Sequence, residues 1–303
     1  RNEDPDYPLV PPVGRNGRPE TARQSFSIDA VNEFDPIFED MYDYCEAQEL
    51  EVDTLIHESG AAQMEINFLH GDAIDLADQV FLFKRTMREA AHRHGIYATF
   101  MAKPMSNEPG SAMHIHQSLE DMDGNNLFGT SEGGNSDLFM HFIAGLQKYT
   151  PAVTALLAPN VNSYRRLTFG ESAPRNVQWG VENRTCGLRV PFSEPSARRV
   201  ENRFAGADAN PYLALAATLA CGYLGMLEKL EPMQEMKASA YDLPYSLPRS
   251  LEESLSHLEQ CEPIKDMLGE RFIRAFVAVK RKEYETYFGV ISRWEREFLL
   301  LNV

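Results

Sequence analysis

Residues 112–119 read AMHIHQSL, and residues 198–204 read RRVENRF. Both segments alternate between polar and apolar side chains, and successive side chains of an extended strand point to opposite faces. Each segment therefore predicts a strand with one polar face. The residues on these two faces are His114, His116 and Ser118, followed by Arg199, Glu201 and Arg203.

Three more segments predict strands, at residues 54–58, 63–68 and 186–191. In the second of them, Met64, Ile66 and Phe68 alternate with polar residues, which is typical of a half-buried strand. The short, glycine-containing stretch 59–62 between the first two predicts a hairpin or a kinked crossover.

Helical periodicity predicts the helices. A helix at 75–94 is followed by Gly95 as a C-terminal cap, and one at 137–149 ends near Pro151. The segment 208–230, with Pro211 at a first helical position, is apolar nearly all round and predicts a buried helix. The other helical regions are 32–48 and the charged segment 251–300, which is expected to form an outer layer over a sheet. Strands with hairpin-like spacing and separate helices favour an α+β fold with a mainly antiparallel sheet.

Composition bounds the function. The chain has 303 residues, of which 43% are apolar, enough for one large domain or two small ones. No apolar run is long enough to enter a membrane, and the four separated cysteines suggest neither a zinc site nor a disulfide framework, which fits a cytoplasmic protein. The formal charge of -16 disfavours nucleic-acid binding and suits a cationic substrate.

The polar faces predict a chemistry. Carboxylates such as Glu58 and Glu65, with an imidazole, are ligands that Mg²⁺ or Mn²⁺ accepts. Two such ions flanked by arginines would suit phosphoryl transfer from ATP. Taken singly, the same residues would be a solvated face or a ladder of surface ion pairs of little energetic weight.

Five ordered motifs make the chain resemble the catalytic domain of the glutamine synthetase family over essentially its whole length. They are HESGAAQMEIN (57–67), KPMSNEPGSAMHIHQS (103–118), NSYRRL (162–167), ENRTCGLRVP (182–191) and ARRVENRFAGADANPYLALA (197–216). The resemblance implies an α+β domain over residues 1–303, with a curved, mainly antiparallel sheet flanked by helices.

The resemblance also implies a role for individual residues. The implied metal ligands are Glu58, Glu65, His114 and Glu201. The implied contacts to glutamate are Gly110, His114, Arg166 and Arg203, and those to ATP are His116, Ser118, Arg189 and Arg199. The implied catalytic residues are Arg184, which stabilises the transferred phosphoryl group, Arg166, and the flap residue Glu171.

The implied activity is that of an ATP-dependent carbon–nitrogen ligase of nitrogen metabolism. ATP phosphorylates the γ-carboxylate of L-glutamate, and an amine then displaces phosphate from γ-glutamyl phosphate. Two or three Mg²⁺ or Mn²⁺ ions per site are implied, in a cytoplasmic homo-oligomer that is a dodecamer in the full-length family.

The sequence departs from the family pattern in two respects, the extent of the chain and the residues that select the amine substrate. The Glu-x-Glu strand and the small N-terminal β domain of the family have no counterpart here, so we expect either a truncated chain or a member without full activity. Pro109 stands where ammonia-using members have Asn. An ungapped count places Ser172, with Glu171 one position early, where those members have the ammonium-binding glutamate. The pattern resembles the γ-glutamylpolyamine synthetases, so a putrescine-like amine is favoured. The alternatives are an ammonia-using glutamine synthetase and a catalytically silent structural or binding member.

Overall fold

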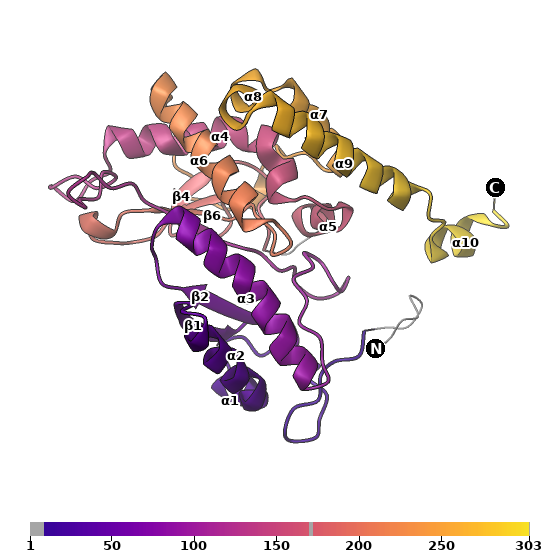
Figure 1. Ribbon diagram of the computed structural model, residues 1–303. Helices are drawn as coiled ribbons and strands as arrows, with labels where there is room; N and C mark the ends of the chain where they lie inside the picture. Colours follow the sequence, from indigo (N-terminus) through magenta and orange to yellow (C-terminus); the bar gives the residue numbers. More distant parts are fainter. Residues whose placement is uncertain (1–8, 170–171, 303) are drawn as a thin grey trace.

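The computed structural model describes residues 9–169 and 172–302 and has an α+β fold. Figure 1 shows the N-terminal helices and hairpin beside a larger part built around a second sheet, with the C-terminal helices on its far side. Each part has its own cluster of buried apolar side chains. The predicted fold class is confirmed.

The N-terminal part is a hairpin covered by helices. It contains α1 (Ile28–Asn32), α2 (Asp35–Ala47), β1 (Val52–His57), β2 (Met64–Phe68) and α3 (Ala73–Arg93). The strands pair antiparallel, with Ile56 opposite Glu65, and the connecting turn holds Ala62 at a φ of 53°. Met64, Ile66 and Phe68 pack against the core of this part, as their alternation predicts. The hairpin prediction is confirmed, and Glu65 is left on the opposite face.

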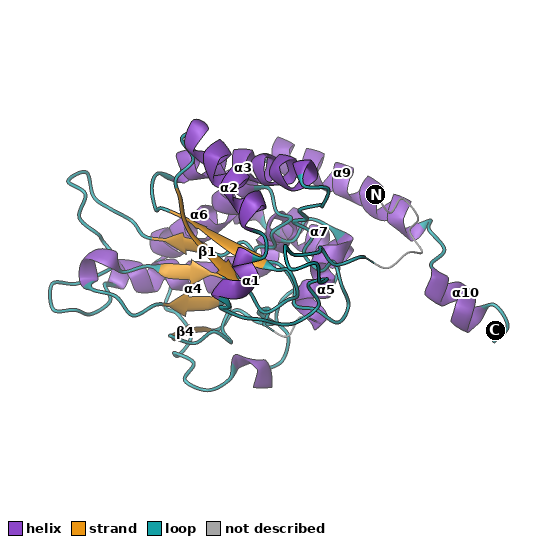
Figure 2. Ribbon diagram, turned by 90° about the horizontal axis from the view of Figure 1, so that it is seen from below, coloured by secondary structure: helices purple, strands orange, loops and turns teal. Residues whose placement is uncertain are grey.

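The second sheet has the strand order β3-β6-β5-β4. Its strands are β3 (Ile115–Gln117), β4 (Trp179–Val181), β5 (Leu188–Val190) and β6 (Val200–Asn202). All pairs are antiparallel except the parallel pair β4–β5. Figure 2 shows the strands near the middle of the molecule, with long helices on one side of them and loops on the side of β4. The predicted strands at 112–119, 186–191 and 198–204 are present in shortened form, and β4 was not predicted.

Two long helices, α4 (Asp137–Leu157) and α6 (Pro211–Glu228), pack against each other and share the larger core with this sheet. They approach at glycines. A Cβ atom added at Gly145 would lie 2.2 Å from the carbonyl oxygen of Cys221 and 2.7 Å from the backbone of Gly225. The two backbones are therefore in direct contact, with no room for a side chain between them.

Helix α4 does not end near Pro151, so that prediction was wrong. The helix includes the proline and continues to Leu157. Val153, Leu156 and Leu157 are almost wholly buried in the larger core, and burial of each such side chain contributes about 1.5–3 kcal/mol. Their sum exceeds the cost of roughly 3 kcal/mol for proline in a helix interior. Tertiary packing thus carries the helix through its weak point.

The C-terminal region is broken into α7 (Leu251–Gln260), α8 (Glu262–Leu268), α9 (Glu270–Phe288) and α10 (Arg293–Leu299). Gly269, at a φ of 93°, separates α8 from α9. Helix α7 packs on α4, and α9 packs on α7. The outer layer therefore covers helix α4 rather than the sheet itself. The remaining elements are α5 (Val161–Phe169) and the short helices η1 (Pro195–Ala197) and η2 (Ala240–Asp242).

All four cysteines are free thiols. Among the described residues, every helix is too short or too polar to pass through a bilayer.

The two parts meet where α3 packs on α6. The Lys84 amine of α3 donates a hydrogen bond of 2.7 Å to the carbonyl oxygen of Ala209, and the Tyr212 hydroxyl donates to Asp78. Burial, assisted by Arg88 and opposed by Asp208, lowers the pKa of the Lys84 amine to about 8.

This depressed pKa gives a pH-dependent stability. Between pH 8 and 10.5 the unfolded chain holds a proton on Lys84 that the folded chain does not, so the free energy of unfolding should rise with pH across this window. We expect the wild type to gain on the order of 2–3 kcal/mol relative to Lys84→Met over that range. Urea unfolding of both proteins at pH 7.5 and pH 10 measures the difference, and a constant difference would contradict the assignment.

Candidate active site

Glu201 lies at the centre of the polar face of the second sheet. On one side its strand β6 pairs with β3, which places His116 opposite Glu201. On the other side β6 pairs with β5, which places Arg189 opposite the same residue. Residues from three separate sequence motifs are thereby brought together by strand register alone.

The carboxylate of Glu201 is 3% exposed and is held by two arginines. Arg189 donates to one oxygen at 2.5 Å, and Arg203 donates to the other at 2.7 Å. Burial on its own would raise the pKa of this carboxyl group, but Arg203, His114 and Arg189 outweigh it and hold the pKa at about 2. Glu201 is therefore an anion over the whole physiological pH range.

The two predicted histidines flank this carboxylate. The Nδ1 atom of His114 lies 3.3 Å from a Glu201 oxygen. Although 30% of its side chain is exposed, burial of the ring among protein atoms and the neighbouring Arg203 lower the pKa of His114 to about 3, so its imidazole is neutral. His116 accepts a hydrogen bond of 3.2 Å from Nε of Arg199, and burial lowers its pKa as well. A neutral imidazole is the form that can donate a lone pair to a metal ion.

The hairpin of the N-terminal part adds two carboxylates. Burial, and next the charge of Glu58, raises the pKa of Glu65, and Glu201 acts in the same direction. Arg184 opposes them. Charges are screened beyond about 10 Å at moderate ionic strength, so the influence of Glu201 and Arg184 on Glu65 indicates that this face of the hairpin is within electrostatic range of the larger part. The structure thus brings Glu58, Glu65, Glu201 and Arg184 into one electrostatic neighbourhood.

The donor set fits a hard divalent cation in its chemistry. Carboxylate oxygens and a neutral imidazole are suitable ligands, and a bound cation would oppose the burial and the charge of Glu58 that raise the pKa of Glu65. Within residues 9–169 and 172–302, however, no three His, Cys, Asp or Glu side chains are already arranged around one point that could hold an ion. Both oxygens of Glu201 are instead engaged by arginines. A cation at Glu201 would therefore compete with two arginines for the same carboxylate.

Gly110 and Arg166, both predicted to contact glutamate, lie against each other. A Cβ atom at Gly110 would meet the Ala102 carbonyl oxygen at 2.7 Å and Cγ of Arg166 at 2.8 Å. The guanidinium of Arg166 donates to the carbonyl oxygens of Arg203 and Phe204 at 2.8 and 2.9 Å. Burial lowers its pKa to about 10, which still leaves it charged. Arg166 therefore links the loop of Gly110 to the end of β6.

The remaining predicted site residues are Ser118 and Glu171. Ser118 follows β3 directly and is exposed. Glu171 lies outside the described residues, and Ser172, the first described residue after that gap, is exposed.

Three polar residues that the sequence analysis did not single out take part in this region. Gln63 donates to the carbonyl oxygen of Gly110 at 3.0 Å and so ties the hairpin turn to the predicted glutamate loop. Lys103 donates to the carbonyl oxygen of Glu108 in the same loop. Glu182 binds Arg189 at 2.9 Å. Glu182 opens the motif ENRTCGLRVP, so an acidic residue two positions before Arg184 was the available signal.

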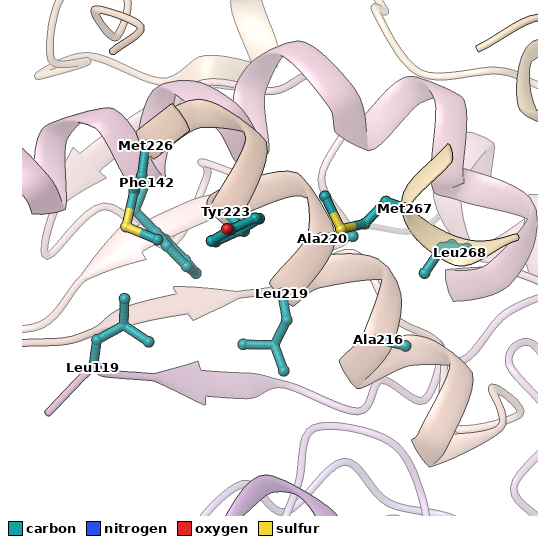
Figure 3. A pocket seen from close by; sticks show the side chains of 9 residues that line it. All are labelled: Leu119, Phe142, Ala216, Leu219, Ala220, Tyr223, Met226, Met267 and Leu268. Carbon is teal, nitrogen blue, oxygen red and sulfur yellow. The ribbon is translucent and has the colours of Figure 1, made fainter. Parts of the chain in front are cut away.

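An apolar pocket of about 330 Å³ lies apart from these charged groups, chiefly between α6 and the end of α8. Figure 3 shows its lining, in which the Tyr223 hydroxyl is the polar atom. Its lining residues are Leu119, Phe142, Ala216, Leu219, Ala220, Tyr223, Met226, Met267 and Leu268. None of the predicted site residues contributes to it, so it is separate from the candidate active site.

Comparison with known proteins identifies the family to which the chain is similar. The family described as glutamine synthetase, catalytic domain, matches residues 1–299. The γ-glutamylputrescine synthetase of Escherichia coli K12 is 36% identical over 308 residues, covering 100% of this chain and 65% of that protein. The glutamine synthetase of Pyrococcus abyssi is 38% identical over 276 residues, covering 88% of this chain and 62% of that protein.

A solved structure agrees with these sequence matches. Apo GmaS without ligand superposes with a TM-score of 0.84 at 31% identity, covering 95% of this chain and 69% of that one. The chain spans less than two thirds of the length of the two relatives from Escherichia coli and Pyrococcus.

Proposed function

The chain belongs to the glutamine synthetase family through its catalytic domain, and from this premise we propose that it is an ATP-dependent ligase that joins an amine to the γ-carboxylate of L-glutamate. The observation that carries the proposal is the buried cluster of Glu201, Arg189 and Arg203, whose carboxylate acts electrostatically on Glu65 of the hairpin. Buried acidic and basic groups in such a mixture suit the binding and transfer of a phosphoryl group.

In the proposed reaction, the γ-carboxylate oxygen of glutamate attacks the γ-phosphorus of ATP, and ADP leaves. The amine nitrogen then attacks the acyl carbon of γ-glutamyl phosphate, phosphate leaves, and the nitrogen loses a proton. Bound Mg²⁺ or Mn²⁺ would neutralise charge on the phosphates, with Glu58, Glu65, His114 and Glu201 as the residues to hold it.

The arginines have separate proposed tasks. Arg184, which is electrostatically close to Glu65, would neutralise charge on the transferred phosphoryl group. Arg189 and Arg199 would bind phosphate oxygens of ATP, with His116 and Ser118 beside them. Arg166 and Arg203 would orient glutamate next to Gly110. Planar guanidinium groups suit these tasks because they stay charged and bind two oxygens at once.

We propose a putrescine-like amine as the preferred second substrate. The similarity to γ-glutamylputrescine synthetase over the full length of this chain supports it. Pro109 supports it too, because a proline has no backbone N–H to donate. The comparable similarity to glutamine synthetases keeps ammonia as the alternative. By family analogy, the protein would act in the cytoplasm as a homo-oligomer.

Phosphate release from ATP in the presence of glutamate tests the proposal. The full-length protein should be assayed with Mg²⁺ or Mn²⁺ and with ammonium, putrescine, longer polyamines and simple monoamines, each against a control without amine. We expect the highest kcat/KM with a diamine. A kcat/KM that is highest with ammonium would contradict the polyamine preference. If no amine stimulates phosphate release, the alternative of a catalytically silent family member would be favoured.

Gly110→Ala tests the glutamate site. The new methyl group would overlap the backbone at Ala102 and the side chain of Arg166, so Arg166 must shift. We expect the KM for glutamate to rise about tenfold, since a misplacement of about 1 Å has effects of this order or larger, while the KM for ATP stays nearly constant. Gly71→Ala is the matched control, because a Cβ atom there meets nothing within 4 Å. Equal behaviour of the two variants would contradict the placement of glutamate.

A further inference from the structure

Arg189 is shared between two carboxylates that lie on opposite ends of its guanidinium group. One terminal nitrogen donates to Glu201 at 2.5 Å, and the other donates to Glu182 at 2.9 Å. The two acids differ in their surroundings, because the Glu201 side chain is 3% exposed and the Glu182 side chain is 37% exposed. Only Glu201 belongs to the predicted cation ligands.

Glu182 is itself fixed in place by the backbone. It follows β4 directly with a φ of 50°, a left-handed conformation that is unusual for a residue with a side chain. Its N–H donates to the carbonyl oxygen of Val190 at 3.1 Å, and its second carboxylate oxygen accepts from the N–H of Phe192 at 2.6 Å. Glu182 is therefore positioned by two backbone groups at the C-terminal end of β5, independently of its contact with Arg189.

Glu201 has competing demands under the proposed function. A divalent cation that binds its oxygens competes with Arg189 and Arg203 for the negative charge of the same carboxylate and repels both guanidinium groups. An arginine released from Glu201 with no other anchor would lose its position and would tend to return to the same carboxylate. Arg189 has such an anchor, since its second nitrogen already binds Glu182.

We propose that Glu182 is a positioning residue that holds Arg189 when Glu201 binds a divalent cation. This inference rests on the proposed function, because the role of Arg189 in binding ATP is part of that proposal. In the described conformation Arg189 bridges both acids. With a cation on Glu201, Glu182 would keep the Arg189 guanidinium at the site. The Arg189 nitrogen that no longer binds Glu201 would then be available for a phosphate oxygen of ATP.

The opposing interpretation is an ordinary, partly exposed ion pair between Glu182 and Arg189. Such pairs contribute little, and removing one would not alter cation affinity through Arg189. The two interpretations differ in the sign and in the coupling of the effects of mutations on cation binding. Binding of Mn²⁺ alone, followed by its electron paramagnetic resonance signal and by calorimetry in the full-length protein, distinguishes them without any need for turnover.

The test is a double-mutant cycle with Glu182→Gln and Arg189→Met. Arg189→Met removes a competitor for Glu201 and should tighten Mn²⁺ binding. Glu182→Gln leaves Arg189 with Glu201 as its carboxylate partner and should weaken Mn²⁺ binding by about tenfold, an effect typical of groups that orient metal ligands. In the Arg189→Met background, Glu182→Gln should change Mn²⁺ affinity less than twofold.

Controls separate folding and net charge from positioning. Glu182→Asn should reproduce the effect of Glu182→Gln, since asparagine tolerates the left-handed backbone. Glu194→Gln removes an exposed acid near η1 and should leave Mn²⁺ affinity unchanged. Equal weakening by Glu182→Gln in both backgrounds, no weakening at all, or no saturable Mn²⁺ binding by the wild type would each overturn the inference. Absence of amine-dependent phosphate release would overturn the proposed ligase function but would leave the Mn²⁺ cycle decisive.

Discussion

Replacing Glu201 by alanine should lower ATP-dependent phosphate release by about 100-fold or more and should also destabilise the fold. The side chain is buried between Arg189 and Arg203, and its loss leaves two guanidinium groups without their shared anion. Breaking a buried ion pair by removing one partner typically costs 3–5 kcal/mol, so we expect a loss of about 3 kcal/mol in the free energy of unfolding. Denaturant unfolding and the phosphate assay measure the two effects.

The conservative variant Glu201→Gln separates activity from stability. Glutamine retains the shape and an oxygen acceptor for one arginine, so the loss of stability should be smaller than for alanine. The loss of activity should remain large, since the amide supplies no charge for a cation. Activity near that of the wild type in either folded variant would refute the assignment of Glu201 to the active site.

Gly145→Ala should destabilise the protein by about 3 kcal/mol, at the upper end of the range for overpacked cores. The added methyl group would lie 2.2 Å from the Cys221 carbonyl oxygen and 2.7 Å from the backbone of Gly225. These atoms belong to α6 and cannot rotate away as a side chain would, so α4 and α6 must separate. The packing of the larger core against both helices would then loosen.

Urea unfolding measures this effect, with Gly71→Ala as the control. A Cβ atom at Gly71 has open space around it and no positive φ, so that variant should stay within 0.5 kcal/mol or so of the wild type. A midpoint for Gly145→Ala equal to that of the control would show that the two helices adjust without cost.

Local alternation and periodicity were sufficient to predict the elements around the site. The pattern of residues 112–119 identifies β3, and that of residues 198–204 identifies β6, because polar and apolar side chains alternate in both segments. The hairpin was predictable for the same reason. The apolar helix α6 was predictable from its apolar character and from Pro211 at its start. In these segments, local preference and tertiary packing agree.

The missed elements are those whose formation depends on distant partners. Strand β4 has three residues, is paired with β5, and is held on its other side by a hydrogen bond from Met236 to the Trp179 carbonyl oxygen. Nothing in so short a segment indicates a strand. Helix α4 passes Pro151 because of burial that only the folded core supplies. Such effects lie outside any sequence window.

For the site, the residue types were predictable and their partners were not. Sequence placed Glu201 and Arg203 on one face, and the family resemblance gave each a role. The guanidinium of Arg166 donates to two backbone carbonyl groups. This arrangement depends on the path of the folded chain and could not be predicted from the sequence. The same is true of Glu182, whose contact with Arg189 depends on the turn after β4.

The presence of two separate buried clusters has a consequence for how the protein opens. Glu58 and Glu65 belong to the N-terminal part, which contains the smaller cluster, whereas Glu201 belongs to the part that contains the larger cluster. If the two parts behave as distinct cooperative units, the N-terminal part should exchange its amide protons by sub-global unfolding while the larger part stays protected. A ligand that contacts acids of both halves would then act as a cross-link, and its binding should slow exchange mainly in the N-terminal hairpin.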